Sequence, residues 1–211
     1  VTIPAVGTSI TFLIFAGILL ALAVAYFVSA KKKSAKAVVG VIVIIIACLT
    51  GHSDSFAFWE NDLVYEGERV YNYLQVSELS DRTILSTNVL FGVQSVFRKE
   101  KGLTGMYYDY AMAAPMMAGV HEKDSLDVLI LGMGTGTFAT RCKRYFGNVT
   151  NLNIEGVEID EAITDLSRQY FHLSEDIPVY TYDGRAFLNA IDKTYDVIMV
   201  DAYQDITIPF Q

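Results

Sequence analysis

Residues 128–160 constrain the fold of this chain more than any other stretch. An apolar run at 128–131 is followed by three glycines at alternate positions: Gly132, Gly134 and Gly136. An amphipathic segment comes next, and then a second apolar run that ends in Glu158 and Asp160. This order predicts a strand, a glycine-rich turn, a helix and a second strand with an acidic tip. Such a unit binds the adenosine part of a cofactor at the carboxyl ends of parallel strands.

Strand-like and amphipathic segments alternate through the last part of the chain. The predicted strands are 126–131, 153–158, 178–182 and 195–200, and the predicted helices are 137–146, 161–171 and 184–190. Continuous apolar strands that alternate with amphipathic helices specify a parallel sheet covered on both faces. The predicted fold class is therefore α/β, with a Rossmann-like parallel sheet of the type that binds S-adenosylmethionine. We expect this sheet to be incomplete at the C-terminus, in a chain that is a segment of a longer membrane protein.

The spacing of the glycines discriminates between cofactors. Dinucleotide-binding enzymes use G-x-G-x-x-G, in which the third glycine lets the helix approach the strand beside a pyrophosphate. Here the third glycine comes one position early, and Thr137 stands in its place. The pattern G-x-G-x-G suits a cofactor without a pyrophosphate, such as S-adenosylmethionine or its relatives. The alternative is that the glycines only make a tight turn.

Three acidic residues follow the ends of predicted strands and face the same crevice. Glu158 lies 22 residues beyond Gly136, where it can accept hydrogen bonds from both ribose hydroxyls of an adenosine cofactor. Asp183 can accept a hydrogen bond from the adenine amino group. Asp201 follows the last predicted strand, so all three carboxylates are expected at one edge of the sheet.

The first quarter of the chain is apolar and contains no acidic residue before Asp54. Residues 9–30 are uncharged and long enough to cross a bilayer, which takes about 20 residues. A basic loop at 31–36, with four lysines, separates them from a shorter apolar run at 37–49. We expect a membrane hairpin over residues 1–52 in contact with lipid; a buried soluble helix is the alternative.

Two arguments about the side of the membrane conflict. The positive-inside rule places the lysine loop in the cytoplasm. A second full crossing would then deliver the following domain to the outside, where adenosine cofactors are scarce. The two apolar runs predict a multi-pass protein of the cell membrane. The cofactor favours a cytoplasmic position for the catalytic domain, and the side is left open.

The chain after the basic loop is strongly acidic. It has a formal net charge of −12, compared with −8 for the whole chain, because the four loop lysines are left out. An acidic surface argues against nucleic acid as a partner and is compatible with a cationic substrate. The two cysteines and three histidines have no metal-ligand spacing, so no metal site is predicted.

Between residues 63 and 97 the hydrophobic pattern changes to period two. A strand that starts at Tyr71 and ends at Glu78, a turn at Ser80 and Asp81, a return strand at 83–85 and a further strand at 89–97 are predicted. These elements predict a small antiparallel β domain over residues 53–101. The cofactor-binding domain then occupies residues 102–211.

A cluster of aromatic side chains surrounds one carboxylate just before the first cofactor-domain strand. The cluster consists of Tyr107, Tyr108, Asp109 and Tyr110, at the start of a predicted helix that ends near Pro115. Tyrosines in such clusters usually lie in a core or an interface. A carboxylate among three phenols is nevertheless a candidate for a substrate site.

Residues 70–211 resemble the spermidine synthase (polyamine aminopropyltransferase) family, especially its bacterial members fused to a membrane domain. The motifs that carry the resemblance are YNYLQVSE at 71–78, the Tyr107 region followed by Pro115, the glycine turn, VEID at 157–160, YDGR at 182–185 and YDVIMVDAY at 195–203. Single motifs of this set are shared with methyltransferases, whereas their combination and order are more specific.

The resemblance implies transfer of an aminopropyl group from decarboxylated S-adenosylmethionine to a small polyamine such as putrescine. It implies that Asp201 accepts the proton of the amine and that Tyr107 is the active-site tyrosine. The implied substrate-binding residues are Tyr108, Asp109 and Asp205. The implied cofactor-binding residues are Asn72, where the family has glutamine, Gly132, Gly134, Thr135, Gly136, Glu158, Asp183 and Gly184. A homodimer is one assembly that we consider.

Two departures from the family pattern keep other functions open. Thr135 stands where the family has an aspartate that pairs with the amine of the decarboxylated cofactor. The family's Asp-x-x-Asp-Pro loop reads Asp201-Ala202-Tyr203-Gln204-Asp205 here, so the second acid is displaced by one residue. The alternatives are a methyltransferase that uses S-adenosylmethionine on a small amine, and a non-catalytic cofactor-binding domain attached to a transporter-like membrane part.

Overall fold

The computed structural model describes residues 3–30, 35–50, 60–69, 72–87 and 92–202. The chain forms two compact units. The first comprises residues 1–61 and 66–72, and the second comprises residues 62–65 and 73–211. Each unit is described by itself below. Asp205, Tyr71, residues 31–34 of the predicted basic loop and residues 89–91 of the strand predicted at 89–97 lie outside the described residues.

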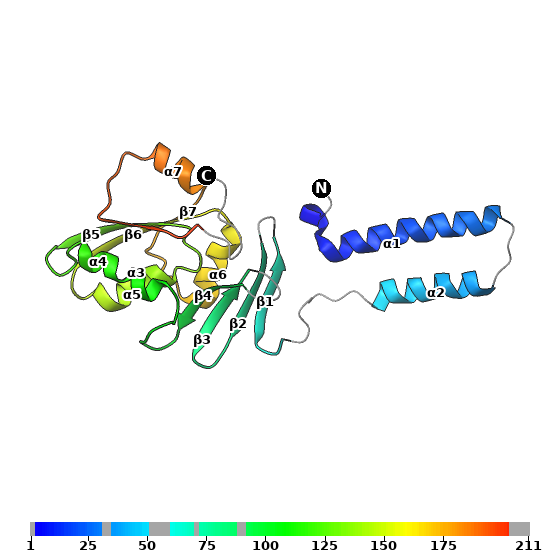
Figure 1. Ribbon diagram of the computed structural model, residues 1–211, viewed down its shortest axis with the longest axis horizontal. Coiled ribbons are helices and arrows are strands. Elements are labelled where there is room, and N and C mark those ends of the chain that lie inside the picture. The colour runs from blue at the N-terminus through cyan, green and yellow to red at the C-terminus, as the bar shows by residue number, and fades with distance from the viewer. Residues whose placement is uncertain (1–2, 31–34, 51–59, 70–71, 88–91, 203–211) are drawn as a thin grey trace. The chain divides into compact units, whose positions relative to one another are not determined.

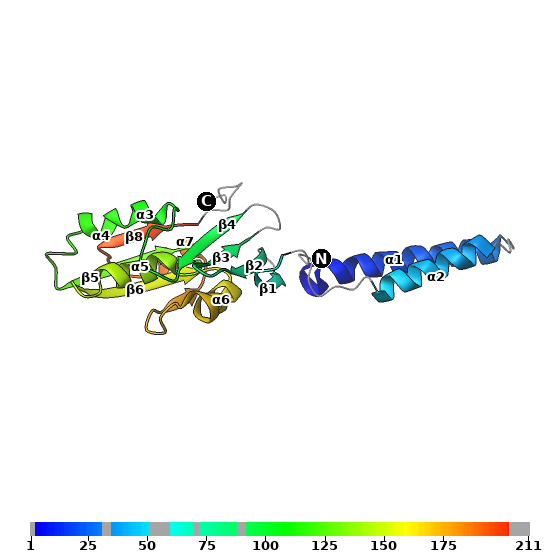
Figure 2. The same ribbon diagram turned by 90° about the horizontal axis from the view of Figure 1, so that it is seen from below.

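The N-terminal unit contains two apolar helices, α1 (Ile3–Ser29) and α2 (Ala35–Thr50). They run side by side in opposite directions (Figures 1 and 2). Within the described residues, one segment, Ile10–Ser29, is long and apolar enough to cross a membrane; the apolar part of α2, Val38–Ala47, is shorter. The structure thus supports one candidate span by length and composition, and the second crossing of the expected hairpin stays a prediction.

An antiparallel sheet follows in the chain, with the strand order β1-β2-β3-β4. Its strands are β1 (Leu63–Glu68), β2 (Tyr73–Glu78), β3 (Arg82–Ser86) and β4 (Val93–Arg98). The turn predicted at Ser80 and Asp81 joins β2 to β3, and the amide of Leu79 donates to the carbonyl of Arg82 across it. The period-two pattern therefore identified this sheet correctly.

The parallel sheet has the strand order β7-β6-β5-β8. Its strands are β5 (Ser125–Leu131), β6 (Asn151–Glu158), β7 (Val179–Thr181) and β8 (Val197–Val200). The chain winds outward from β5 through β6 to β7 and then crosses back to place β8 on the other side of β5 (Figure 1). This reversal of winding is the topological switch point at which open α/β sheets bind ligands.

Three helices connect these strands: α5 (Thr137–Phe146), α6 (Glu161–Phe171) and α7 (Gly184–Ala190). Their bounds agree with the predicted ones because local signals set them. The side chain of Asp160 accepts from the amide of Ala162 at the start of α6, and that of Asp183 accepts from the amide of Ala186 at the start of α7. Both are N-caps that satisfy amides without partners inside the helix.

The helices cover both faces of the parallel sheet. Figure 1 shows α7 on one side and α5 on the other. On the α5 side, Phe138 and Cys142 share a buried cluster with Val128 and Ile130 of β5. On the α7 side, Phe187 packs against a cluster that contains Leu131. A separate cluster joins α6 to the antiparallel sheet, and its buried members are Leu74, Val76, Leu85, Phe97, Ile163, Leu166 and Phe171. The antiparallel sheet is therefore packed onto the cofactor domain through α6.

The helix predicted to end near Pro115 differs in the structure. The segment forms two short helices, α3 (Tyr108–Ala111) and α4 (Ala113–Met117), with Pro115 inside the second. Pro115 is the third residue of α4, where the backbone amide would have no partner inside the helix. The missing N–H of proline therefore does not end the helix at this position.

Candidate active site

The site is built where β5 and β8 end side by side. The amide of Asp201 donates to the carbonyl of Leu131 at 2.8 Å, which continues the pairing of the two strands beyond β8. Gly132 follows Leu131 with φ of 78°, and a Cβ atom there would overlap the carbonyl oxygen of Asp201. Only glycine suits this position. The glycine turn and Asp201 are consequently in direct backbone contact.

The glycine turn lies against the end of β6. The amide of Gly132 donates to the carbonyl of Val157 at 2.9 Å, and the amide of Gly134 donates to Glu158 Oε2 at 2.8 Å. Thr135 is fully buried, and its hydroxyl oxygen lies 3.0 Å from that of Thr137. Gly136 has a left-handed backbone and directly precedes α5. The turn thus joins the ends of β5 and β6 to the first turn of α5.

Glu158 is almost fully buried beside this turn, with 7% of its surface exposed. Burial raises the pKa of Glu158, and the amides of Gly134 and Asp160, which donate to its carboxylate, oppose the rise without cancelling it. Each carboxylate oxygen can accept more than one hydrogen bond. Glu158 is therefore a fixed carboxylate with acceptor capacity beyond its amide partners.

Asp201 forms the other side of the site together with Tyr107. The Tyr107 hydroxyl donates to Asp201 Oδ2, although 94 residues separate the two in sequence. Burial raises the pKa of Asp201 and the hydrogen bond from Tyr107 lowers it, and burial prevails. The Tyr107 side chain is 42% exposed, so the pair is accessible from solvent. A carboxylate with a raised pKa that a phenol orients is suited to accept a proton.

Tyr108 and Asp109, which were predicted to bind substrate, have partners inside the protein. The Tyr108 hydroxyl accepts from the amide of Val96 at 2.9 Å, and burial raises the pKa of Tyr108 to about 12. The carboxylate of Asp109 accepts from the amide of Gly105 at 2.8 Å and lies 2.9 Å from Arg141 Nη2. These contacts tie the segment after β4 to the body of the domain, and a substrate-binding role for either residue stays a prediction.

The remaining predicted residues lie at several places. Asp183 caps α7, and Gly184 is the first residue of that helix, close to Leu131 of β5. Asn72 lies in the N-terminal unit directly before β2, where its carbonyl accepts from the amide of Arg69. Their roles in cofactor binding, and that of Asp205, stay predictions.

Sequence reasoning missed Arg141, which is 6% exposed in α5. The sequence contained a signal for this burial. Arg141 lies three residues after Phe138 and one before Cys142, on the apolar side of the predicted helix. Arginine is almost never fully buried without a partner. Its position on an apolar face indicated a buried anion, which the structure identifies as Asp109.

Residues 106–209 match the family described as the spermine/spermidine synthase domain. A probable polyamine aminopropyl transferase of Bifidobacterium longum is 59% identical over 186 residues, which are 88% of this chain and 40% of that protein. A polyamine aminopropyltransferase of Clostridium beijerinckii is 30% identical over 119 aligned positions, and the match covers 54% of this chain and 39% of that protein. The chain thus spans about two fifths of the length of these relatives.

The fold is also similar to that of a solved structure. The crystal structure of a probable spermidine synthase from Corynebacterium glutamicum aligns with a TM-score of 0.58 and 20% sequence identity, and it covers 69% of this chain and 54% of that chain. At this level of identity the likeness shows the fold. It agrees with the parallel sheet and the antiparallel sheet described above.

Replacing Gly132 by alanine tests the contact that builds the site. The variant Gly132→Ala should lose about 1–2 kcal/mol through its positive φ, and about 1–3 kcal/mol more because its methyl group displaces the Asp201 backbone. Gly105→Ala is the matched control, since Gly105 has φ of 81° and open space around its Cβ position. Urea unfolding followed by circular dichroism measures both. Equal losses in the two variants would contradict the proposed contact.

Proposed function

The chain carries a domain of the spermine/spermidine synthase family, and from this premise we propose that its site transfers an aminopropyl group from decarboxylated S-adenosylmethionine to a small polyamine such as putrescine. The observation that carries the proposal is the hydrogen bond between Tyr107 and Asp201 beside the glycine turn. This contact supports an assignment in which Asp201 accepts a proton beside the sulfonium cofactor.

In this proposal the cofactor lies along the carboxyl ends of β5, β6 and β7. Glu158 accepts hydrogen bonds from the ribose hydroxyls, because its carboxylate retains acceptor capacity beside the turn. Asp183 and Gly184 bind the adenine. The cap of α7 uses Oδ1 of Asp183, and Oδ2 is assigned to the adenine amino group. The glycine turn lets the cofactor approach the backbone closely.

The reaction forms a bond between the amine nitrogen and the carbon beside the sulfonium, and it breaks the bond from that carbon to sulfur. The electron pair of the broken bond stays on sulfur, which becomes a neutral thioether and leaves without a general acid. The attacking amine is an ammonium near neutral pH and must first lose a proton. Asp201 attracts the ammonium and accepts this proton, while Tyr107 holds Oδ2 and leaves Oδ1 for the amine.

One observation favours a second candidate function, methyl transfer from S-adenosylmethionine to a small amine. Thr135 occupies the position at which the family that this chain resembles has an aspartate. It is buried, and its hydroxyl lies within hydrogen-bond distance of that of Thr137. The position therefore supplies no charge to pair with the amine of the decarboxylated cofactor. Transfer of a methyl group would need the same proton acceptor, so Asp201 and Tyr107 would act in the same way.

We further propose that α1 anchors the protein in a membrane and contacts lipid. Most of its described side chains between Ile10 and Ser29 are exposed and apolar, including Phe12 at 70% and Val28 at 72%. We also propose a second crossing by α2. The side of the membrane that carries the catalytic domain is left open in this proposal, because the lysine loop and the cofactor favour opposite sides.

The decisive variant for the proposed reaction is Asp201→Asn. Without a proton acceptor, turnover of decarboxylated S-adenosylmethionine and putrescine should fall by about 10²- to 10⁴-fold. Cofactor affinity measured by calorimetry should stay within a few-fold of the original. Asp192→Asn, an exposed position beyond α7, is the control and should leave both quantities unchanged. Full turnover in the Asp201→Asn variant would exclude the proposed mechanism.

The role of Glu158 predicts a pH dependence of cofactor binding. Ribose hydroxyls donate to the ionised carboxylate, so bound cofactor favours the ionised form of a group whose pKa is raised in the free protein. Affinity should be highest above this raised pKa and should fall as the pH drops through it. Calorimetry over a pH series measures the effect.

Two variants make this pH experiment specific. In Glu158→Gln the affinity should be lower at neutral pH and the dependence on Glu158 ionisation should disappear. Glu161→Gln, an exposed acid in the first turn of α6, should behave like the original protein. An unchanged pH profile in Glu158→Gln would show that this carboxylate does not hold the ribose.

A further inference from the structure

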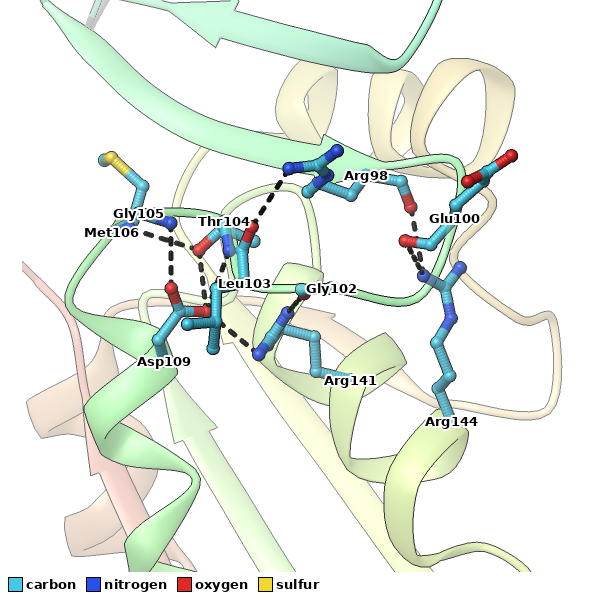
Figure 3. A network of polar contacts seen from close by, with 10 residues as sticks. All are labelled: Arg98, Glu100, Gly102, Leu103, Thr104, Gly105, Met106, Asp109, Arg141 and Arg144. Atoms are coloured by element: carbon cyan, nitrogen blue, oxygen red, sulfur yellow. Dashed lines mark hydrogen bonds and ion pairs between the residues drawn. The ribbon is translucent and has the colours of Figure 1, made fainter.

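We propose that the buried ion pair between Asp109 and Arg141 is a positioning device that holds Tyr107 against Asp201. The inference rests on the proposed function, in which Tyr107 and Asp201 act on the amine. It assigns Arg141, a residue that contacts neither cofactor nor amine in our proposal, a role in the geometry of the reaction. Figure 3 shows the network that surrounds this pair.

The carboxylate of Asp109 accepts three hydrogen bonds from the loop that precedes it. Its Oδ1 accepts from the amide of Thr104 at 3.1 Å and from the Thr104 hydroxyl at 2.9 Å, and its Oδ2 accepts from the amide of Gly105 at 2.8 Å. Burial raises the pKa of Asp109, but these donors and Arg141 outweigh burial and lower it overall. Asp109 is therefore an ionised anchor in an almost closed environment.

Arg141 connects this anchor to the helix that follows the glycine turn. Its Nη2 lies 2.9 Å from Asp109 Oδ1, and its Nη1 donates to the carbonyl of Gly102 at 2.9 Å (Figure 3). The guanidinium also stacks over the ring of Tyr145, 5.3 Å from its centroid. The side chains of Arg141 and Asp109 are only 8% and 10% exposed. Because α5 begins at Thr137, directly after the turn, the pair links the turn to the loop at 102–105.

Tyr107 lies between the loop at 102–105, which the Asp109 carboxylate holds, and Tyr108, which is held to β4. Asp109 is two residues further on, and its amide donates to the carbonyl of Met106. Tyr108 is held to β4 by its bond to the amide of Val96, and its ring packs against that of Tyr107 at 4.6 Å between centroids. These contacts fix the backbone on both sides of Tyr107. Its partly exposed side chain is thereby directed at Asp201.

A buried ion pair of this kind is better suited to fixing geometry than to adding stability. The desolvation of two charges offsets much of their attraction, whereas removal of one partner leaves an uncompensated buried charge. Without Arg141, the Asp109 carboxylate would have to move toward water or take up a proton. Either change would loosen the loop at 102–105 and displace Tyr107.

Arg144 provides a matched control in the same helix. Its Nη1 donates to the carbonyls of Arg98 at 3.0 Å and Glu100 at 3.2 Å, and no carboxylate is among these partners (Figure 3). It holds the chain just after β4, several residues before Tyr107. Replacing it removes a similar arginine-to-carbonyl contact without touching the Asp109 anchor.

The test compares Arg141→Met with Arg144→Met in the purified protein. In Arg141→Met the kcat for aminopropyl transfer should fall on the order of 10- to 100-fold, since small displacements of a positioning group have effects of this size. The affinity for the cofactor should stay unchanged. Arg141→Lys should recover part of the rate, because lysine keeps the charge and loses the planar fork. Arg144→Met should keep the original kcat.

The pH profile adds a readout that a purely structural role would not change. The titratable groups that face Asp201 from the described residues are Tyr107 and Tyr108. Because the bond from Tyr107 lowers the pKa of Asp201, its loss should shift the acid limb of the rate profile to higher pH in Arg141→Met. Arg144→Met should leave the limb in place.

Hydrogen exchange tests the inference independently of turnover. Amides of the peptide at 102–110 should exchange faster in Arg141→Met than in Arg144→Met. If the original protein transfers no aminopropyl group, the proposed function fails, and this comparison still decides whether the ion pair holds the Tyr107 segment. Equal exchange and equal kcat in the two variants would overturn the inference.

A second variant covers the case in which Arg141→Met does not fold. The double variant Asp109→Asn with Arg141→Met removes both charges and leaves no unpaired ion in the interior. It should fold, with the same loss of kcat and the same faster exchange at 102–110. A double variant with the original kcat and exchange would contradict the positioning role.

Discussion

The contact between the backbones of Gly132 and Asp201 is the constraint on which the rest of the site depends. Parallel pairing of β5 with β8 brings the two residues together, and the absence of a side chain at Gly132 lets the carbonyl of Asp201 approach. The proposed cofactor site on the glycine turn and the proposed proton acceptor after β8 become neighbours in this way. Since β8 is reached only after the chain has passed through β6 and β7, the neighbourhood exists only in the folded sheet.

The carboxylates of Glu158, Asp201 and Asp109 are in different environments, and this separates the roles that we propose for them. Burial prevails at Glu158 and Asp201 and raises both pKa values, which suits groups that exchange hydrogen bonds or protons with ligands. At Asp109 a set of amide, hydroxyl and guanidinium donors prevails and lowers the pKa. Asp109 is therefore already fully engaged. This difference distinguishes a carboxylate that holds the structure from those we assign to chemistry.

The parts of the fold that local signals specify could be predicted from the sequence. The helices α5, α6 and α7 follow from amphipathic periodicity and from caps such as Asp160 and Asp183. The positions of Glu158 and Asp201 at strand ends followed from the same pattern. The pairing of Asp109 with Arg141, and of Tyr107 with Asp201, could not be predicted, because both depend on how segments distant in sequence pack together. Pro115 misled the helix prediction, because its effect depends on its position within the helix.

The most direct test of the central claim is a calorimetric titration of the purified protein with decarboxylated S-adenosylmethionine and with S-adenosylmethionine. The proposed aminopropyl transfer requires a site that accommodates the decarboxylated form, despite the threonine at position 135. We predict that the decarboxylated cofactor binds more tightly. Tighter binding of S-adenosylmethionine would contradict the account and favour methyl transfer at the same site.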